Sequence, residues 1–492
     1  MAMYNDFGSP LDLWVTHSFD KLFLESEKPD GARTEYEVYA AKNETEGVHI
    51  ALRSPTVLDG LFLKLTTPDD ADVAAQVFHV RGGILELDGK NYTDPAVPID
   101  LQKPISLAAG ITTALLLEFS VAPNACAGAR DYRLSVTDAD GRTLAEASIV
   151  LHVWNFALPV AKRFQSSVNT QVAPQKEIYE MLLSHNFCGR TLPVDVLSKE
   201  ADAYLSDPRV NCFFVLNVST DEYLTAVYEK LKDHPAWLGK ACFYALDEPR
   251  TLEMAKKLEE RCKRLRALCP DFHITSPFYS DVQIDEQTDQ IDCMAGLLDL
   301  HCPKLSCWDD KNIYSAEQAA KYPPFASRMK ALQARGDKVW AYVCNTPPKP
   351  YLNVRVDDEG IGGRVLFWQM YQRELDGFLY WNATYYDRLP DKDPWKSVDT
   401  FSDQIYGDGI LIYPGEPVGV DGPVASIRLK LIRDGLDDIA LFDLAEAYFG
   451  REWVMARVNK ATSSLTSVDV TGDALLALRR EIGDAIESAS NT

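Results

Sequence analysis

The first part of the chain alternates apolar and polar residues in short runs. Successive side chains of a strand point to opposite faces, so this alternation predicts β-strands buried on one side. Turn signals separate the runs at residues 59–60, 81–83 and 138–142, and Asp140-Gly141 in the last of these is typical of a two-residue hairpin turn. Many short strands separated by turns predict a β-sandwich. The six runs are 34–40, 49–53, 61–65, 113–119, 132–136 and 147–154.

From Arg163 onward, short apolar runs alternate with amphipathic helical stretches. Eight such β-then-α units predict a (β/α)8 barrel of the TIM type, and an open doubly wound sheet is the alternative. The chain has no G-x-G-x-x-G or Walker-type loop that would favour nucleotide binding by an open sheet. The expected strands are 164–169, 188–193, 212–218, 241–246, 273–279, 297–308 (with a break near 303), 339–344 and 377–382, and the helices are 175–187, 221–233, 252–269, 316–335 and 362–375.

The end of the chain is mainly helical in its pattern. A short apolar run at 410–415 precedes three expected helices at 426–449, 453–462 and 473–489. We therefore predict a multidomain protein with β and α/β parts. Its domains would be an N-terminal β-sandwich (1–157), a catalytic (β/α)8 barrel (158–400) and a C-terminal extension packing on the barrel (401–492).

The chain is acidic overall. Among its 492 residues it has 73 acids and 50 bases, a formal net charge of −23. This excess argues against nucleic acid and against an anionic membrane surface as partners, since both need a basic face. The N-terminal residues lack a basic region followed by an apolar core, so we expect a cytoplasmic protein, with an exported protein that has lost its leader as the alternative. The oligomeric state is left open.

The ten cysteines predict neither disulfides nor a metal site. None forms a C-x-x-C pair, and several lie in apolar runs, which indicates buried reduced thiols. His301, Cys302 and Cys307 do not have the spacing of a zinc site, and we expect His301 to be a core imidazole. We expect no metal and no cofactor.

The candidate chemistry lies in the segment 243–250, FYALDEPR. An apolar strand ends there in Asp247 and Glu248, followed by Pro249. In a barrel the active site gathers where the strands end, so both acids would lie at its mouth. Two neighbouring carboxylates resist joint ionisation, which allows one to donate a proton while the other stays charged. The structural alternative is that these residues only begin the next helix.

The adjacency of the two acids favours one kind of glycosidase. Most glycosidases place two carboxyl groups on opposite sides of the scissile bond, which neighbours on one strand cannot easily do. Adjacent acids suit a 2-acetamido sugar that supplies its own nucleophile. In that case Asp247 would orient the acetamido group and Glu248 would act as acid and then base.

Aromatic and amide side chains cluster near the ends of the later strands. Sugar rings stack on aromatic faces, so acids surrounded by such residues favour a carbohydrate substrate. Packing in the core is the alternative for each aromatic residue taken alone. The substrate-binding candidates are Tyr279, Trp308, Trp340, Tyr342, Asn345, Trp381, Asn382, Tyr385 and Tyr386.

Several segments resemble glycoside hydrolase family 123 and the uncharacterised proteins that share its catalytic domain. The similar segments follow the order of that family along most of the chain. They are 40–53, 243–249, 340–347, 350–357, 364–369, 377–386 with 393–395, 413–415 and 426–438.

The resemblance implies a β-sandwich followed by a catalytic barrel. It also implies a retaining exo-β-N-acetylgalactosaminidase that uses substrate-assisted catalysis on a terminal β-linked 2-acetamido sugar. Glu248 then becomes the acid/base and Asp247 the acetamido stabiliser. Two alternatives stay open: a glycosidase with a separate nucleophile such as Asp309 or Asp310, and a carbohydrate-binding protein without catalysis.

Overall fold

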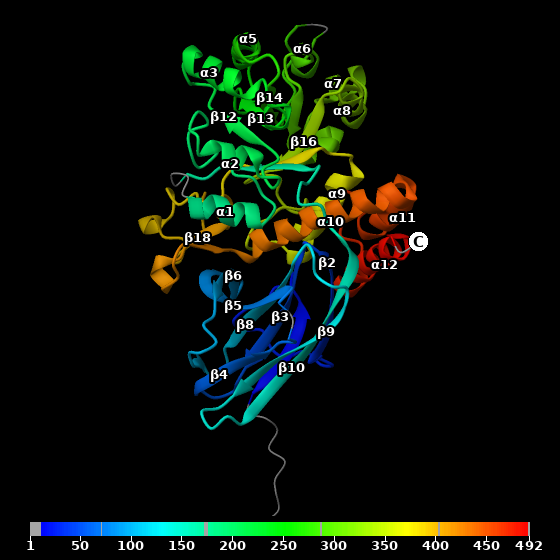
Figure 1. The fold of residues 1–492 in the computed structure, drawn as a ribbon. Helices are drawn as coiled ribbons and strands as arrows, with labels where there is room; N and C mark the ends of the chain where they lie inside the picture. The colour runs from blue at the N-terminus through cyan, green and yellow to red at the C-terminus, as the bar shows by residue number, and fades with distance from the viewer. Residues whose placement is uncertain (1–10, 70, 172–175, 286–287, 402–403, 491–492) are drawn as a thin grey trace, which may run out of the picture.

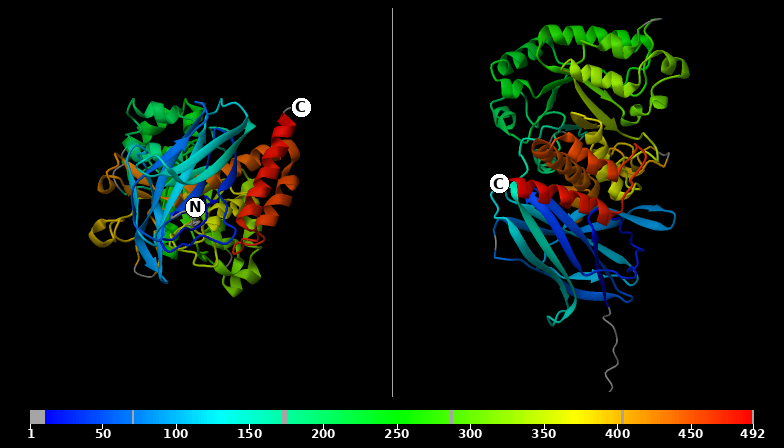
Figure 2. Two further views of the ribbon diagram at one scale, coloured as in Figure 1. Left: turned by 90° about the horizontal axis from the view of Figure 1, so that it is seen from below. Right: turned by 90° about the vertical axis from the view of Figure 1, so that its right-hand side faces the viewer.

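The computed structural model describes residues 11–69, 71–171, 176–285, 288–401 and 404–490. A β-rich N-terminal region lies at one end of the molecule and a larger α/β part at the other (Figure 1). Helices from the last quarter of the chain lie at the junction between them, as the two further views confirm (Figure 2). No helix in these ranges is both long and apolar enough to cross a bilayer.

Two five-stranded sheets make up the β-rich region and share one hydrophobic core. Ile50 and Leu117 of one sheet and Leu134 and Ile149 of the other are fully buried in it. All six strand runs expected from the alternation lie in these sheets. The first sheet has the order β1 (Asp12–His17), β3 (Thr45–Arg53), β8 (Thr112–Val121), β5 (Val73–Leu87) and β6 (Lys90–Pro98), and the second β2 (Glu35–Lys42), β10 (Thr143–Ala157), β9 (Gly128–Thr137), β4 (Leu58–Thr66) and β7 (Ile105–Leu107).

The turn signals were only partly interpreted correctly. Residues 59–60 and 81–83 lie inside β4 and β5, where the pairing register shifts, so they form irregularities within strands rather than turns. The loop after β9 closes with a 3.0 Å hydrogen bond from Asp138 N–H to the Arg142 carbonyl, which leaves three residues at its tip instead of two. Gly141 has a φ of 80° there, as a three-residue hairpin requires.

Seven parallel strands form a near-barrel in the α/β part. Each neighbouring pair in this sheet is parallel. The order is β11 (Gln165–Val168), β17 (Gly377–Tyr380), β16 (Lys338–Val343), β15 (Leu300–Pro303), β14 (His273–Phe278), β13 (Ala241–Tyr244) and β12 (Phe213–Val215).

A complete eight-stranded barrel is not confirmed, because the expected second strand is reduced to a short bridging segment. Gly189 makes an isolated parallel bridge with Val168 of β11, and Phe214 N–H donates to the Arg190 carbonyl at 2.6 Å on the other side. Pro193, which has no N–H, follows closely. The segment therefore links β11 and β12 without becoming a regular strand.

Prolines also explain two other differences from the expected elements. The helix expected at 316–335 is divided at Pro323-Pro324 into α7 (Ala316–Lys321) and α8 (Phe325–Ala334). The sixth strand ends at Pro303, and the following residues form the 3-10 helix η1 (Leu305–Trp308). Trp308 thus lies on a helical turn and not on a strand.

The remaining elements surround the strands or follow them. The helices beside the near-barrel are α1 (Lys176–Ser184), α2 (Ala201–Ser206), α3 (Asp221–Leu231), α4 (Pro235–Leu238), α5 (Leu252–Leu268), α6 (Gln290–Met294) and α9 (Gly360–Gln372). The rest are η2 (Asp310–Asn312), η3 (Pro390–Lys392), β18 (Ile412–Pro414), η4 (Glu416–Val418), β19 (Pro423–Ala425), α10 (Ile427–Phe449), α11 (Arg451–Ala461) and α12 (Gly472–Ser490).

Buried ion pairs join the β-rich region to the α/β part. The Arg364 guanidinium on α9 contacts Glu46 of β3 and Asp438 of α10, each at 2.7 Å. Arg479 on α12 contacts the same Asp438 at 2.8 Å. All four side chains are almost completely buried. The junction therefore depends on charges that compensate one another.

Candidate active site

A cavity of about 190 Å³ lies at the carboxyl ends of β13, β16 and β17. This end of the parallel strands is where α/β enzymes place their catalytic groups. The cavity is smaller than the about 300 to 1,000 Å³ of pockets that enclose drug-sized ligands, so it suits a single sugar residue. Its lining residues are Tyr244, Asp247, Glu248, Pro277, Tyr342, Cys344, Asn345, Leu379, Trp381, Phe401 and Asp408.

Asp247 and Glu248 both line this cavity although they are neighbours in sequence. In an extended strand, consecutive side chains would point to opposite sides. β13 ends at Tyr244, however, and Glu248 has a φ of 40°, in the left-handed region that a glutamate rarely occupies. This strained backbone departs from the strand alternation. Strain of this kind is often found at functional sites.

Each of the two acids accepts a hydrogen bond from its own tyrosine. Tyr244 donates to Asp247 Oδ1 at 2.5 Å, and Tyr342 donates to Glu248 Oε1 at 2.5 Å. Burial raises the pKa of both phenols well above the usual value, and the neighbouring carboxylates raise it further. The two hydroxyl groups therefore stay protonated and hold the carboxyl groups in place.

The helix that follows does not use these acids as its cap. Thr251 is the N-cap of α5, and its side chain accepts a 3.2 Å hydrogen bond from Met254 N–H. Asp247 and Glu248 precede this cap and lie outside the helix. The alternative that the two acids only begin the helix therefore does not account for them.

Three of the aromatic and amide candidates also line the cavity: Tyr342, Asn345 and Trp381. Tyr342 is the last inward-pointing residue of β16 and reaches Glu248. Trp340 points to the same side two residues earlier, about 7 Å deeper in the barrel at the usual rise per residue. It is completely buried there, packing against Phe214, and belongs to the core.

The other candidates lie outside the cavity lining. Asn382 is buried and its Oδ1 accepts from Thr384 N–H at 2.9 Å, so it fixes a turn. Tyr386 donates to the Ile412 carbonyl, and Trp308 packs edge-to-face on Phe325 at 5.3 Å.

Neither Tyr279 nor Tyr385 lines the cavity. Tyr279 lies beside two basic side chains, and Tyr385 lies beside the lining residue Trp381. Lys304 and Arg250 lie 4.8 and 5.7 Å from the ring centroid of Tyr279. Tyr385 packs edge-to-face on Trp381 at 4.7 Å. They are neighbours of the site and not part of its wall.

Asp408 is the lining residue of greatest chemical interest that sequence reasoning missed. It lies in the loop after Tyr406, between Gly407 and Gly409, which have φ values of 76° and 78°. Its Oδ1 accepts from Trp381 Nε1 at 2.9 Å and from Tyr380 Oη at 3.1 Å. Burial raises its pKa to about 6. The only signal in the sequence is an acid placed between two glycines.

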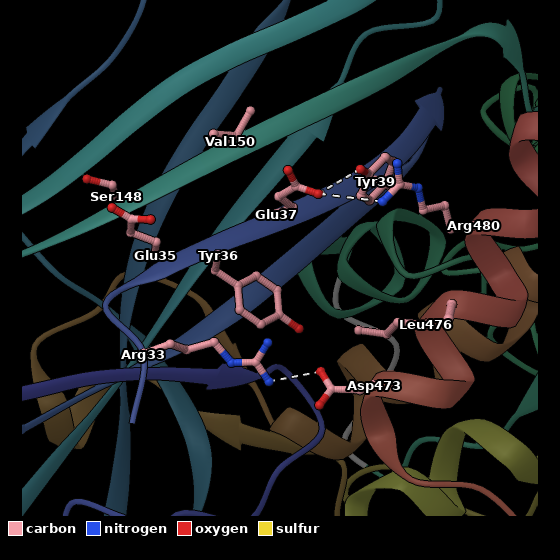
Figure 3. Close-up of a pocket in the computed structure, with 11 residues that line it drawn as sticks. Arg33, Glu35, Tyr36, Glu37, Tyr39, Ser148, Val150, Asp473, Leu476 and Arg480 are labelled. Carbon is pink, nitrogen blue, oxygen red and sulfur yellow. Dashed lines mark hydrogen bonds and ion pairs between the residues drawn. The ribbon is translucent and has the colours of Figure 1, made fainter. Parts of the chain in front are cut away.

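A larger hollow of about 580 Å³ lies elsewhere, between α12 and the outer face of β2 and β10 (Figure 3). Four of its five charged side chains, all except Glu35, are paired with one another. Arg33 contacts Asp473 at 2.9 Å, and Glu37 accepts from Tyr39 at 2.7 Å (Figure 3). None of the candidate residues lines this hollow. The smaller cavity, which Asp247 and Glu248 line, is therefore the candidate active site.

No group of three or more potential metal ligands occurs among the described residues. His301 is buried, and its Nε2 lies 3.1 Å from an Asp337 carboxylate oxygen, as a core imidazole would. Cys302 and Cys307 are buried free thiols.

Comparison with known proteins identifies the class of this domain. Residues 217–445 match the family model described as glycoside hydrolase 123, catalytic domain. Among solved structures, a family 123 glycoside hydrolase from Clostridium perfringens matches with a TM-score of 0.69 and 11% identity over 98% of both chains. That protein hydrolyses glycolipid glycans. No curated protein sequence matches the chain.

A second solved structure is much more distant. The glycoside hydrolase family 2 β-galacturonidase from Eisenbergiella tayi, bound to galacturonate, has a TM-score of 0.32 and 11% identity over 87% of this chain and 73% of its own. The overall fold is that of the Clostridium enzyme, and the family match over residues 217–445 supports a glycoside hydrolase. The resemblance to glycoside hydrolase family 123 is confirmed, since residues 217–445 match the model of that family's catalytic domain.

Proposed function

We propose that the protein is a retaining exo-β-N-acetylhexosaminidase of the β-N-acetylgalactosaminidase type, acting by substrate-assisted catalysis. One observation carries the proposal: two sequence neighbours, Asp247 and Glu248, line the same cavity, which has room for one sugar residue. Adjacent carboxyls cannot easily flank a sugar ring, as a conventional nucleophile and acid must. They can serve an acetamido group and the glycosidic oxygen, which lie on neighbouring carbons.

In the proposed mechanism Glu248 protonates the glycosidic oxygen while the C1–O bond breaks. The acetamido carbonyl oxygen bonds to C1, and Asp247 accepts from the acetamido N–H and stabilises the positive oxazolinium ion. Water then attacks C1 and gives its proton to the Glu248 carboxylate. The ring of the intermediate opens, and the sugar leaves with its β configuration retained.

The tyrosine contacts support this division of roles. The Tyr244 hydroxyl restrains Asp247, and the Tyr342 hydroxyl restrains Glu248, so each carboxyl is held at a separate point of the wall. Such restraint lowers the cost of orienting the reacting groups.

A mechanism with a separate carboxylate nucleophile has less support. Asp309 Oδ2 accepts from Tyr351 Oη at 2.6 Å, and Asp310 Oδ1 accepts from Phe325 N–H at 3.0 Å. Neither residue lines the cavity. The substrate we propose is a glycan with a terminal β-linked 2-acetamido sugar. The Clostridium protein hydrolyses glycolipid glycans.

Unequal effects of two substitutions test the proposed roles. Glu248→Gln should lower kcat/KM by about 10²- to 10⁴-fold on substrates with poor leaving groups and far less on activated aryl glycosides, because only the former need protonation. Asp247→Asn should lower it by about 10²-fold or more on both, since the oxazolinium ion forms in either case. Steady-state kinetics on both substrates measure this difference.

Asp309→Asn is the matched control, because Asp309 also accepts a tyrosine hydroxyl but lies outside the cavity. It should retain near-normal turnover. If Asp247→Asn kept near-normal turnover as well, the role assigned to Asp247 would be wrong.

A further inference from the structure

The carboxyl group of Asp408 is only half satisfied. Its Oδ1 accepts two hydrogen bonds, from Tyr380 Oη and Trp381 Nε1, while its Oδ2 is buried and has no hydrogen-bond partner among the described residues. The side chain is 1% exposed and lines the cavity. A buried acceptor without a partner is costly, so a donor supplied by a ligand would complete it.

The loop that carries Asp408 is fixed from several sides. Gly409 N–H donates to Tyr380 Oη at 3.1 Å, and Arg428 Nη1 donates to the Gly407 carbonyl at 2.7 Å. A Cβ atom at Gly407 would lie 2.6 Å from Val356, and one at Gly409 would lie 2.5 Å from Trp381. The carboxyl is therefore held rigidly, as a recognition group should be.

Asp408 faces the two acids from across the near-barrel. It is bound to the end of β17 through Tyr380 and Trp381, whereas Asp247 and Glu248 follow β13. β16, β15 and β14 separate these two strands in the sheet. All three acids nevertheless line one cavity, so a sugar between them would meet Asp408 with the edge opposite its reacting carbons.

We propose that Asp408 accepts a hydrogen bond from the 4- or 6-hydroxyl of the terminal sugar and thereby distinguishes sugars that carry this hydroxyl from sugars that lack it. The inference rests on the proposed function, which places C1 and the 2-acetamido group at Glu248 and Asp247. The far edge of a pyranose ring then presents C4 and C6. The 4-hydroxyl is also the group whose orientation distinguishes galacto- from gluco-configured sugars.

The proposal differs from a purely structural role for Asp408. A structural carboxyl would hold Tyr380 and Trp381 through Oδ1, and its loss would affect every substrate alike. A recognition carboxyl discriminates between substrates that have the hydroxyl and substrates that lack it. Sites built to bind a hydroxyl reject the analogue without it strongly, because a buried polar group is then left unpaired.

The test combines Asp408→Ala with deoxy substrates. The substrates are the 4-nitrophenyl 2-acetamido-β-glycoside, its 4-deoxy analogue and its 6-deoxy analogue. The wild-type enzyme should prefer the intact sugar over one of the analogues by about 100-fold or more in kcat/KM. In Asp408→Ala this preference should fall below about fivefold, because the group that senses the hydroxyl is gone. Asp309→Asn, the matched control, should keep the wild-type preference.

Binding of the free N-acetylated monosaccharides, followed by tryptophan fluorescence, provides a readout independent of turnover. Asp408→Ala should weaken binding of the intact sugar about tenfold or more and leave binding of the sensitive deoxy sugar unchanged. An undiminished preference, or equal binding by the variant and the wild type, would overturn the inference while the proposed function stands. If the wild type binds these sugars through Asp408 but hydrolyses none, the proposed function fails and the inference holds. If the wild type neither binds nor cleaves any of these sugars, both the inference and the proposed function fail.

Discussion

At the scale of single residues, the site depends on how three carboxyl groups are held. Asp247 and Glu248 each accept from a buried tyrosine, and Asp408 accepts from a tyrosine and a tryptophan. Within the described part of the chain none of these three acids forms an ion pair, unlike the buried acids at the junction. Their acceptor atoms therefore remain available to a substrate.

Burial of Asp408 outweighs the effect of the nearby arginines on its pKa and predicts a pH-dependent stability difference. Its pKa is about 6 in the folded protein, raised by burial, against an ordinary value of 3.8. Between these values the folded state binds more protons than the unfolded state, so its stability falls as the pH rises. Asp408→Asn removes that loss and should stabilise the protein by up to about 3 kcal/mol above pH 7 and by almost nothing below about pH 3.

Thermal or denaturant unfolding of both proteins across this range measures the difference. The substitution leaves the groups that face the carboxyl unchanged. These groups are Tyr380, Trp381, Cys344, Arg355 and Arg428. Asp12→Asn, which alters an exposed ion pair with Lys28, is the control and should be neutral at every pH. A destabilised Asp408→Asn at neutral pH would contradict the account.

The sequence predicted part of the site for a clear physical reason. Asp247 and Glu248 end an apolar strand, so their position at the mouth follows from the topology. Trp340 and Asn382 are buried outside the cavity lining, because counting along a strand does not give depth in the near-barrel. Asp408 could not be found, because its loop has no periodic pattern and its partners come from another element.

At the scale of elements, the loop between Tyr406 and Ile410 depends on its two glycines. Gly409 has a φ of 78°, and a Cβ there would lie 2.5 Å from Trp381. Trp381 and Asp408 share a hydrogen bond, so a change in one moves the other.

Gly409→Ala should therefore reduce stability and activity together. The positive φ and the clash with Trp381 should together lower the free energy of unfolding by about 2 kcal/mol or more. The displaced Trp381 should lower kcat/KM about tenfold or more, which unfolding and kinetic measurements would detect.

Gly419→Ala separates the strain of a positive φ from the steric clash, because Gly419 has a φ of 73° but open space around it. This substitution should lower the free energy of unfolding by about 1 kcal/mol and leave kcat/KM unchanged. Equal activity of the two variants would mean that the loop does not position the site.

Most elements followed from the hydrophobic pattern, and the exceptions have local causes. The strand alternation located the sheets of the β-rich region. The expected second strand of the near-barrel does not form, because Gly189 packs against Tyr179 and Pro193 soon follows. A divided helix and a shortened sixth strand likewise reflect prolines, whose effect the apolar pattern does not contain.

At the scale of the whole molecule, the β-rich region contributes to the active site indirectly. Asp94 of β6 forms a buried ion pair with Arg428 of α10 at 2.8 Å. The same guanidinium donates to the Gly407 and Ile410 carbonyls on either side of Asp408. A contact from the N-terminal region therefore supports the wall of the cavity.

The net charge of the chain did not predict this arrangement. Excess acid suggests only a solvated surface, whereas Glu46, Glu118 and Asp438 are buried and paired with arginine or lysine at the junction. Such pairs join residues far apart in sequence. Composition cannot reveal them, and only the assembled fold brings the partners together.

The central claim is that the substrate's own acetamido group performs the attack, with Asp247 and Glu248 assisting. The most direct measurement compares kcat/KM for two 4-nitrophenyl β-glycosides that differ only in a 2-acetamido or a 2-hydroxyl group. The account predicts that the acetamido substrate is cleaved at least about 10³-fold faster, because its nucleophile is intramolecular. Comparable cleavage of the two substrates would contradict it.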